Sequence, residues 1–309
     1  MFPQSVAINS FIPIFRRLIV KELKRKGVSQ TEIARMLGIT QAAVSKILKA
    51  SHNENSISLR GLDISLLEIK LIARKVAELL YEKNINEAGI LANRYWWLIA
   101  ASGDACRAHE RYGWRKSECY ICTKIVYPDL DISRGLTLAD LERALLVLSA
   151  SKTFHKLIPE VMSNLAVAIP GAKSIYDIAA VPGRISKTKT GDIIYRRPEF
   201  GASRHLASIL LSVKNKYRAV MNIKFDNYVR RIIEDLGVRY EVFSSNDFPT
   251  RNPAATAAYH LIEKCPECKV LIDVGGQGIE PVTYIFGDRA VEIVEFVIQL
   301  AEIYDALLR

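Results

Sequence analysis

The sequence predicts a multidomain protein with an all-α N-terminal part and an α/β C-terminal part. At 309 residues the chain is longer than a typical single domain of about 100 to 200 residues. Apolar residues recur at helical spacing through about the first half of the chain, whereas strand-like runs alternate with helical segments in the rest. Half of the residues are hydrophobic and a quarter are charged, a globular composition that excludes a disordered chain. We therefore expect three units, at residues 1–60, 61–135 and 136–309.

The sequence gives no sign of a membrane-spanning or secreted protein. No apolar run reaches the roughly 18 residues that a spanning helix needs, because acidic residues interrupt even the apolar C-terminal segment. The N-terminal segment lacks the basic start of a secretory signal, and Arg16 and Arg17 follow too early in the chain for the apolar stretch of such a signal. The expected location is therefore cytoplasmic, with no membrane partner.

Positive charge is concentrated near the N-terminus. The formal charge is +10, and residues 1–60 hold ten Lys or Arg against three acidic residues, a net +7. A small basic unit joined to a nearly neutral body is typical of a nucleic-acid-binding head on a sensor or an enzyme. Charge alone leaves open a solvated basic helix with no partner.

Three short helices are predicted in the basic unit. Apolar residues recur at helical spacing over 8–26, and a glycine follows as a natural stop. Ser29 stands three residues before a glutamate, a capping-box pattern that opens a second helix. Gly38 permits a tight turn, and Thr40 caps a third helix over 41–49. This order of helices and turns is a helix-turn-helix.

The segment SQTEIARMLGITQAAVSKIL resembles the helix-turn-helix of archaeal and bacterial repressors. Its third helix exposes amide, hydroxyl and ammonium groups that can reach base edges or phosphates. The implied partner is double-stranded operator DNA, although such three-helix units sometimes serve protein contacts only. The residues expected to contact DNA are Gln30, Thr31, Thr40, Gln41, Ala42, Ser45, Lys46 and Lys49.

Two further amphipathic helices are predicted at 62–82 and 86–102, separated by a polar turn. Helix pairs that follow DNA-binding heads commonly dimerise, and a twofold dimer matches DNA half-sites about one helical turn apart. We therefore expect a homodimer. Trp96 and Trp97 lie in the second apolar stripe, where aromatic residues more often belong to a core or an interface than to a ligand site.

Four residues after these helices have the spacing of a zinc site. The pattern is C-x2-H, nine residues, and then C-x2-C, formed by Cys106, His109, Cys119 and Cys122. Two such knuckles supply four ligands, enough for a closed tetrahedral zinc. We expect structural zinc without catalysis, because four protein ligands leave no open position. The alternative is reduced, buried cysteines beside a surface histidine.

A second C-x2-C pair, Cys265 and Cys268, directly precedes the strand-like segment VLIDV. Such a pair can be redox-active or form half of a metal site. No other cysteine remains to complete a site, and no thioredoxin-like context surrounds the pair, so we expect a structural role.

The C-terminal part alternates strands and helices. It follows a helix that Thr137 is expected to cap, with Asp140 in its first turn. Strands are predicted at 164–170, 177–181, 193–197, 219–225 and 270–274, and helices at 205–216, 226–237, 255–264 and 290–308. This alternation predicts an α/β domain.

Three glycine-bearing loops, at 180–185, 198–205 and 273–281, adjoin strand-like runs. Main-chain N–H groups and helix N-termini in such loops can hold a phosphate. The sequence Gly-Ala-Ser-Arg-His opens a helix and therefore places polar and cationic side chains near the positive end of the helix dipole. Neither GxGxxG nor GxxxxGK[ST] is present, which argues against dinucleotide and P-loop nucleotide sites. The loops predict an anion pocket.

Five segments carry a resemblance to a known family: LIPEVMSNLAVAIPGAKSIYDIAAVPGRI, PEFGASRHLA, AVMNIKF, LIDVGGQGIEP and FGDRAVEIVEFV. Over residues 157–304 the chain resembles the ThiN-type thiamine-phosphate synthase domain of archaea. The resemblance implies a three-layer α/β/α sandwich around a mixed sheet, similar to class II aldolases, and a dimer. Members carry this domain fused to a hydroxymethylpyrimidine phosphate kinase, as an enzyme, or to an N-terminal helix-turn-helix, as a repressor of thiamine biosynthesis genes. This chain has the second arrangement.

The resemblance also implies the site residues. The synthase joins a pyrimidine pyrophosphate to a thiazole phosphate, and its principal Arg and His correspond to Arg184 and His205. Met162 stands where the family usually has Gly, and SSNDFP at 244–249 departs from the usual Asp-Arg pattern; both place turnover in doubt more than binding. The residues expected to bind thiamine phosphate or diphosphate are Asn164, Gly183, Arg184, Gly201, Ser203, Arg204, His205, Asn222, Asp273, Gly275, Gly276, Gly278 and Glu280.

Two functions of different class follow. The first is a transcriptional regulator of thiamine genes, most simply a repressor, whose C-terminal domain senses thiamine phosphate or diphosphate. The second is an active thiamine-phosphate synthase, with magnesium, that also carries a DNA-binding head. A sensor of another phosphorylated metabolite is a third. End-product repression favours a corepressor, but the operator and the sign of the response stay open.

Overall fold

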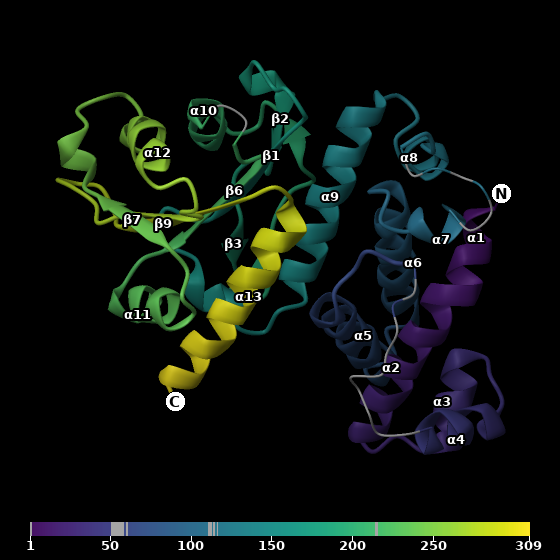
Figure 1. The fold of residues 1–309 in the computed structure, drawn as a ribbon. Helices are drawn as coiled ribbons and strands as arrows, with labels where there is room; N and C mark the ends of the chain where they lie inside the picture. Colours follow the sequence, from purple (N-terminus) through teal and green to yellow (C-terminus); the bar gives the residue numbers. More distant parts are fainter. Residues whose placement is uncertain are drawn as a thin grey trace. The chain divides into compact units, whose positions relative to one another are not determined.

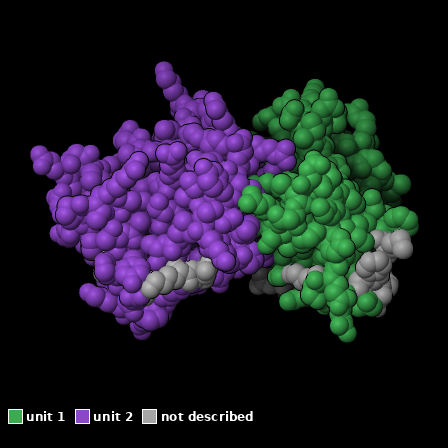
Figure 2. Space-filling model, turned by 90° about the horizontal axis from the view of Figure 1, so that it is seen from above, with its two compact units in different colours: residues 1–139 green, residues 140–309 purple. Residues whose placement is uncertain are grey.

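The structure is a computed structural model that describes residues 2–50, 59, 61–110, 113, 115, 117–213 and 216–309. The chain forms two compact units, residues 1–139 and 140–309, coloured separately in Figure 2. The finer division of the N-terminal part at residue 60 stays a prediction. Within the described ranges, no helix is both long enough and apolar enough to cross a membrane.

The first unit is entirely helical (Figure 1). Its first helix begins at Pro3, earlier than predicted, where the missing proline N–H is one that the helix could not use in any case. A π-helical turn precedes Pro13, which has no N–H to donate to the carbonyl of residue 9, and Ile12 donates instead to Ala7. The elements are α1 (Pro3–Val6), η1 (Ala7–Phe11), α2 (Ile12–Arg25), α3 (Gln30–Leu37), α4 (Gln41–Lys49), α5 (Leu66–Tyr81), α6 (Ile85–Ala101), α7 (Arg107–Glu110), α8 (Ile121–Val126) and the start of α9 (Ile132–Ser149).

The core of the first unit lies where α2 and α6 pack against α5. An aromatic cluster joins α2 and the π-helical turn to α6: the ring centroids of Phe11 and Phe15 are 4.9 Å apart, and those of Phe11 and Trp96 are 5.2 Å apart. Tyr95 completes the cluster and is fully buried. Trp96 therefore serves the core, as the apolar stripe predicts.

The second unit is an α/β domain built on a seven-stranded sheet in the order β5-β2-β1-β6-β9-β8-β7. Its strands are β1 (Asn164–Ala168), β2 (Ile178–Ala180), β5 (Glu199–Phe200), β6 (Ala219–Lys224), β7 (Tyr240–Phe243), β8 (Val270–Asp273) and β9 (Val282–Gly287), with a separate hairpin of β3 (Ser186–Lys187) and β4 (Ile193–Ile194). Its helices are α10 (Arg204–Ser212), α11 (Asn227–Asp235), α12 (Pro253–Lys264) and α13 (Ala290–Leu307), with short 3-10 turns η3 (Phe154–Leu157), η4 (Ile175–Asp177) and η5 (Ser245–Asp247).

The sheet is mixed and has helices on both faces. Only the β7–β8 pair is parallel among the pairs of this sheet in the described chain, and the others are antiparallel. α10 and α12 cover one face, and α11 and α13 cover the other (Figure 1). Every residue of β1, β2, β8 and β9 is buried, as expected of strands covered on both sides. The predicted three-layer α/β arrangement is confirmed.

Small side chains bring α10 and α12 close to the sheet. Ala166 and Ala180 on the strands face Ala207 on α10 and Ala257 on α12 within one buried cluster. Because alanine adds no more than a methyl group, helix backbones can approach both the sheet and each other closely. This close approach sets the helix N-termini beside the ends of the strands.

The helix expected to begin at Thr137 begins instead at Ile132, so the predicted cap is wrong. The Thr137 hydroxyl donates to the carbonyl of Ser133, 2.8 Å away, as it does inside a helix. Asp140 serves another helix: its carboxylate accepts from the N–H of Ala290 at 2.6 Å and pairs with Arg289 at 3.0 Å. A carboxylate at the N-terminus of α13 is favoured by the helix dipole.

Candidate ligand pocket and DNA-binding face

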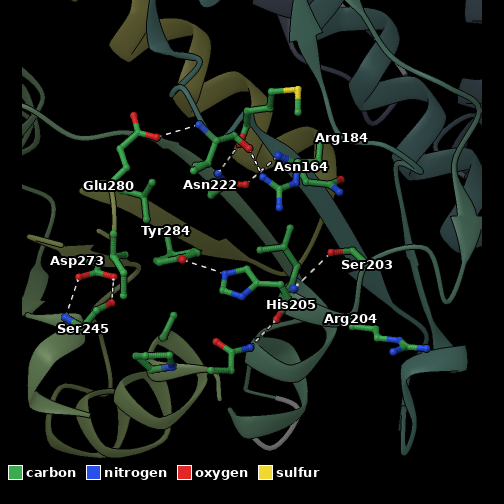
Figure 3. A pocket seen from close by; sticks show the side chains of 18 of the residues that line it. Asn164, Arg184, Ser203, Arg204, His205, Asn222, Ser245, Asp273, Glu280 and Tyr284 are labelled. Atoms are coloured by element: carbon green, nitrogen blue, oxygen red, sulfur yellow. Dashed lines mark hydrogen bonds between the residues drawn. The ribbon is translucent and has the colours of Figure 1, made fainter. Parts of the chain in front are cut away.

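A cavity of about 540 Å³ lies in the second unit, within the range typical of small-molecule sites. The N-terminal ends of α10 and α12 meet there with the first residue of β1, the last residue of β8 and the first residue of β9. Ten of the thirteen predicted ligand residues line it: Asn164, Gly183, Arg184, Ser203, Arg204, His205, Asn222, Asp273, Gly278 and Glu280. Segments distant in sequence therefore converge on one site (Figure 3).

The three remaining predicted residues are not among those that line the cavity. The N–H of Gly201 donates to the carbonyl of Ile178 on β2, the strand next to the edge strand β5. Gly275 has φ +83, and its N–H donates to Asp273. A Cβ at Gly276 would lie 2.5 Å from Oδ1 of Asn246, so a larger residue would have to displace the Asn246 side chain. These glycines shape the loops around the cavity.

Two non-glycine residues of the cavity have left-handed backbone. Met162 has φ +64 and Arg184 has φ +72, and only Lys83 shares this property among the other described non-glycine residues. The left-handed conformation costs free energy in a non-glycine residue. It persists only where the surrounding structure holds the backbone in place, often at functional sites. The Arg184 guanidinium donates to the carbonyl of Val161, so its side chain bridges the two strained loops.

Two buried asparagines hold these loops in place. The Asn164 side chain exchanges hydrogen bonds with both backbone groups of Val181, at 2.9 and 3.1 Å. The Asn222 side chain accepts from the N–H of Asn164 at 2.8 Å and donates to the carbonyl of Met162 at 3.0 Å. Both were predicted to bind ligand and both line the cavity, and their polar atoms also position the loop that carries Arg184.

The carboxylates of the cavity are occupied by N–H and O–H donors. Asp273 accepts from the N–H groups of Ser245 and Gly275, and from the Ser245 hydroxyl at 2.5 Å. Glu280 accepts from the N–H groups of Glu160 and Val161, at 2.9 and 2.8 Å. These hydrogen bonds hold both carboxylates in place, and within the described chain neither carboxylate forms an ion pair with an arginine of the cavity.

Cationic and dipolar groups therefore dominate the cavity. Within the described chain, the guanidinium groups of Arg204 and Arg251 have no carboxylate partner, and Figure 3 shows the Arg204 side chain directed away from His205. Ser203 caps α10, and Asn252 at the start of α12 accepts from the N–H of Ala255 and donates to the carbonyl of His205 at 3.1 Å. Two helix N-termini and three arginines suit an anionic ligand.

His205 lines the cavity, and its Nε2 is 2.9 Å from the Tyr284 hydroxyl (Figure 3). Its ring is accessible from the cavity, but burial among surrounding protein atoms, and then the charge of Arg184, lower its pKa below the ordinary value. Burial, followed by the charge of Asp273, raises the pKa of Tyr284 above that of a free tyrosine. At neutral pH both groups are uncharged, and the imidazole can give or accept a hydrogen bond.

Sequence reasoning missed four polar residues of the cavity: Tyr284, Ser245, Arg251 and Asn252. Tyr284 lies on β9, a strand that was not predicted. The Asn252-Pro253 pair was a usable signal, because asparagine before proline marks the start of a helix. Ser245 begins the 3-10 turn η5, within the segment 244–249 that departs from the family pattern, and Arg251 follows that segment. No local signal points to either residue.

The predicted helix-turn-helix is present in the first unit. Ser29 caps α3 and Thr40 caps α4, each accepting a hydrogen bond from the N–H three residues on. Gly38 ends α3 with φ +62, the left-handed conformation that favours glycine. Ile33 and Val44 are fully buried between the helices.

The outer face of α4 carries the predicted DNA contacts. Thr40, Gln41, Ala42, Lys46 and Lys49 are exposed, and Ser45 is half-buried. The Gln41 amide donates to Oε1 of Gln30 at 2.6 Å, which fixes its direction. Gln41 keeps one N–H and its carbonyl oxygen for a base edge, the pair that reads adenine in the major groove. Gln30, predicted as a phosphate contact, supports Gln41 in addition.

The four residues of the predicted zinc site lie in α7, α8 and the segments beside them. Cys106, His109 and Cys122 are buried, and Cys119 is partly exposed. Burial, followed by the proximity of Cys106 and Cys119, raises the pKa of the Cys122 thiol to about 12. The ligand atoms of these residues do not come within 4.8 Å of one another in groups of three; in the described chain, Glu241, Cys265 and Cys268 do. Zinc at the predicted site stays a prediction.

The fold and the cavity define a two-part protein, in which a DNA-binding helix-turn-helix unit accompanies an α/β domain with an anion pocket. Residues 140–299 match the family described as thiamine-phosphate synthase ThiN, and residues 19–59 match a helix-turn-helix family. The chain therefore belongs to the ThiN family and carries a helix-turn-helix at its N-terminus.

Two relatives illustrate the match. Thiamine-phosphate synthase ThiN from Methanothermobacter thermautotrophicus is 32% identical over 188 residues, which cover 56% of this chain and 96% of that protein. The bifunctional thiamine biosynthesis protein ThiDN from Methanocaldococcus jannaschii is 35% identical over 160 residues, which cover 49% of this chain and 38% of that protein. The matched region is thus well under half of the bifunctional relative.

A solved structure shares the fold of the second unit. The crystal structure of the C-terminal domain of protein MJ0236 aligns with a TM-score of 0.52 and 32% identity, covering 56% of this chain and 97% of that one. The cavity residues therefore belong to the part of the chain that has relatives of known fold.

Proposed function

We propose that this protein is a transcriptional regulator of thiamine biosynthesis or transport genes, acting as a repressor that binds thiamine phosphate or thiamine diphosphate. The observation that carries the proposal is the presence, in one chain, of an exposed helix-turn-helix face and a ThiN cavity rich in arginine. The first supplies sequence-specific DNA contacts and the second a receptor for a phosphorylated ligand. A bound ligand regulates only if it favours one DNA-binding state over the other.

The proposed ligand matches the cavity by chemistry. Its phosphate takes charge-assisted hydrogen bonds from Arg184 and from the N–H groups at the start of α10. Neutral His205, held by Tyr284, adds a hydrogen bond without a further charge. In this proposal the chain acts as a homodimer on a twofold operator, and structural zinc at Cys106, His109, Cys119 and Cys122 orders the segment after α6.

The test begins with the operator. The full chain selects sequences from a random duplex library, with and without thiamine phosphate, and calorimetry measures thiamine phosphate binding to the same preparation. We expect micromolar or tighter ligand binding and a different yield of selected DNA when ligand is present. Enrichment of no sequence under either condition would overturn the regulatory proposal.

A second candidate is an active thiamine-phosphate synthase with magnesium. The favouring observation is that Arg184 and His205 line the same cavity, where the arginine can hold departing pyrophosphate and the imidazole can donate to it. The assay supplies pyrimidine pyrophosphate, thiazole phosphate and magnesium, and follows thiamine phosphate. Product that disappears in both Arg184→Ala and His205→Ala would establish the synthase; its absence from protein shown to bind thiamine phosphate would leave a dedicated sensor.

A further inference from the structure

A second cluster of ligand-type side chains lies away from the cavity, where α12 ends and β8 begins. Cys265 follows α12 directly, and Cys268 stands two residues before β8. The third member is Glu241 on β7, which pairs with Leu271 of β8 in the parallel register. One carboxylate oxygen and the two sulfur atoms lie within 4.8 Å of one another. The sequence left this pair without a further ligand because Glu241 is 24 positions upstream and reaches it only through the β7–β8 pairing.

The two cysteines form a disulfide in this structure. Their Cα atoms are 5.3 Å apart, and the N–H of Cys268 donates to the carbonyl of Cys265 at 3.1 Å, closing a tight turn. A tetrahedral zinc with Zn–S bonds of about 2.3 Å holds its sulfurs about 3.8 Å apart. Side-chain rotation can supply that separation across the same turn, so one backbone serves both the disulfide and a metal-bound pair.

The surroundings favour a bound cation over a bare pair of thiols. The Glu241 carboxylate has no hydrogen bond or ion pair in the part of the chain that the structure describes, although it is half-buried. Cys268 is 3% exposed, whereas Cys265 and Glu241 are partly open to solvent, which leaves an entry path. Residues from other segments hold the turn in place. The Tyr217 hydroxyl donates to the carbonyl of Cys268 at 3.0 Å, and Arg239 forms an ion pair with Glu267.

From this geometry we infer a metal site: in its reduced state the chain binds a thiophilic divalent ion, preferably zinc, through Cys265, Cys268 and Glu241. Two thiolates select zinc over calcium or magnesium, and the carboxylate completes three protein ligands with water in the fourth position. The α12 helix of 12 residues spans about 18 Å between this site and the cavity, so the ion acts structurally, tying the edge strand β7 to the α12–β8 turn.

The disulfide and the metal site exclude each other, and a two-electron step converts one into the other. A dithiol reductant attacks the disulfide, the bond between the two cysteines breaks, and the reductant closes its own disulfide. Two electrons and two protons pass to the pair. Zinc binding then releases the two thiol protons to solvent.

The experiment measures metal binding to the full chain. Protein is reduced with dithiothreitol, freed of reductant and metal under argon, and titrated with cobalt(II), whose sulfur-to-metal charge-transfer absorption reports thiolate ligands. Each variant is also assayed for zinc content after dialysis against zinc. Cys119→Ser removes a sulfur ligand from the predicted zinc site of the first unit. Cys265→Ser removes one from the site inferred in the second unit, so the two variants separate the two contributions.

We expect reduced wild-type protein to hold one more metal equivalent than either Cys265→Ser or the oxidised wild type. Glu241→Gln should weaken this site about tenfold or more, whereas Glu302→Gln, which removes an exposed carboxylate from α13, should not. The comparison of oxidised and reduced wild type needs no substitution, and its repetition in Cys119→Ser shows whether thiols of the first unit contribute to the difference. Equal metal content in these two states would overturn the proposal, and an unchanged affinity in Glu241→Gln would overturn the assignment of the third ligand.

Discussion

Backbone conformation explains one departure of this chain from its family. The resemblance expects glycine where Met162 stands, and the structure gives this residue φ +64, a region that glycine enters without cost. The strain amounts to about 1–2 kcal/mol and is held by Asn222, which donates to the carbonyl of Met162. The substitution therefore bears on stability at the cavity, while the hydrogen bonds that place Arg184 remain.

Replacing Met162 should reveal this strain. Met162→Gly relieves about 1–2 kcal/mol of backbone strain. Glycine's greater freedom in the unfolded chain costs about 0.5–1 kcal/mol in return. We therefore expect an unchanged or slightly higher free energy of unfolding. Met162→Val should lose about 1–2 kcal/mol, because a β-branched residue tolerates positive φ poorly. Urea denaturation of the two variants measures the difference, and a more stable Met162→Val would refute this account.

Arg184 should carry much of the affinity for a phosphorylated ligand. Hydrogen bonds to charged groups contribute about 1.5–3 kcal/mol each, so Arg184→Ala should weaken thiamine phosphate binding about tenfold to a hundredfold. Calorimetry measures the dissociation constant. Arg231→Ala removes an equal charge from the exposed face of α11 and should leave it unchanged. Similar losses in both variants would mean that net charge, rather than this site, attracts the ligand.

His205 should make stability fall in acid. Its pKa in the folded protein is lowered by burial and then by Arg184, so below the unfolded value of about 6.5 the unfolded chain binds the proton more tightly. Stability from this residue is complete above that pH and is lost as the pH falls through the folded pKa. Urea denaturation at about pH 7.5 and about pH 5.5 should show a larger loss for wild type than for His205→Gln. An equal loss in both proteins would assign the acid sensitivity to other groups.

Local sequence signals predicted individual residues unevenly. Arg184 and His205 were found because glycine-bearing loops and a helix start mark their positions. Asn164 and Asn222 were predicted to bind ligand, and the structure shows that their amides also hold backbone groups of the loops around the cavity. An asparagine beside a pocket has the same sequence signal in either role. Glu241 could not be found, since Cys265 and Cys268 lie in the turn before β8, which only the folded sheet brings beside β7.

At the scale of elements, the short helices α3 and α4 were predictable because each has its own cap. Ser29 and Thr40 begin their helices and Gly38 ends one, and these signals act within a few residues. β7 and β9 were missed because their stability comes from neighbouring strands on the sheet. Thr137 misled because a threonine inside a helix can donate to the preceding turn and look like a cap in sequence.

The outer face of α4 should read DNA sequence. Gln41→Ala together with Ser45→Ala removes an amide and a hydroxyl without changing charge, so we expect discrimination between a selected operator and random DNA to fall by about 1–3 kcal/mol for each lost base contact. Lys49→Ala should instead weaken binding to both and reduce the salt dependence. Fluorescence anisotropy across a salt series separates the two effects, with Lys173→Ala, an exposed lysine of the second unit, as the charge control. Unchanged discrimination in the double variant would mean that this face does not read bases.

At the scale of the whole molecule, the proposed regulation depends on communication between two units that each have their own core. A ligand confined to the second unit can alter DNA binding only by binding two states of the protein unequally. Residues of α9 belong to both units, since the helix runs from Ile132 to Ser149 across the boundary after Ala139.

The decisive prediction is reciprocal linkage. If thiamine phosphate is a corepressor, it should tighten operator binding about fivefold to 150-fold, which corresponds to a coupling free energy of about 1–3 kcal/mol. Thermodynamics then requires operator DNA to tighten thiamine phosphate binding by the same factor. Anisotropy measures the first effect and calorimetry on the preformed protein–DNA complex measures the second.

Arg184→Ala provides the control for this linkage. At ligand concentrations that just saturate the wild type, it should lose most of the bound ligand and of the response while keeping the DNA affinity of ligand-free protein. An inducer would give the same two factors with opposite sign, so the experiment also determines the direction of regulation. Tight ligand binding with unchanged operator affinity would mean that the pocket does not regulate the helix-turn-helix, and synthesis of thiamine phosphate would become the function to pursue. Two unequal factors would violate linkage and would indicate that ligand and DNA were not acting on the same population of folded protein.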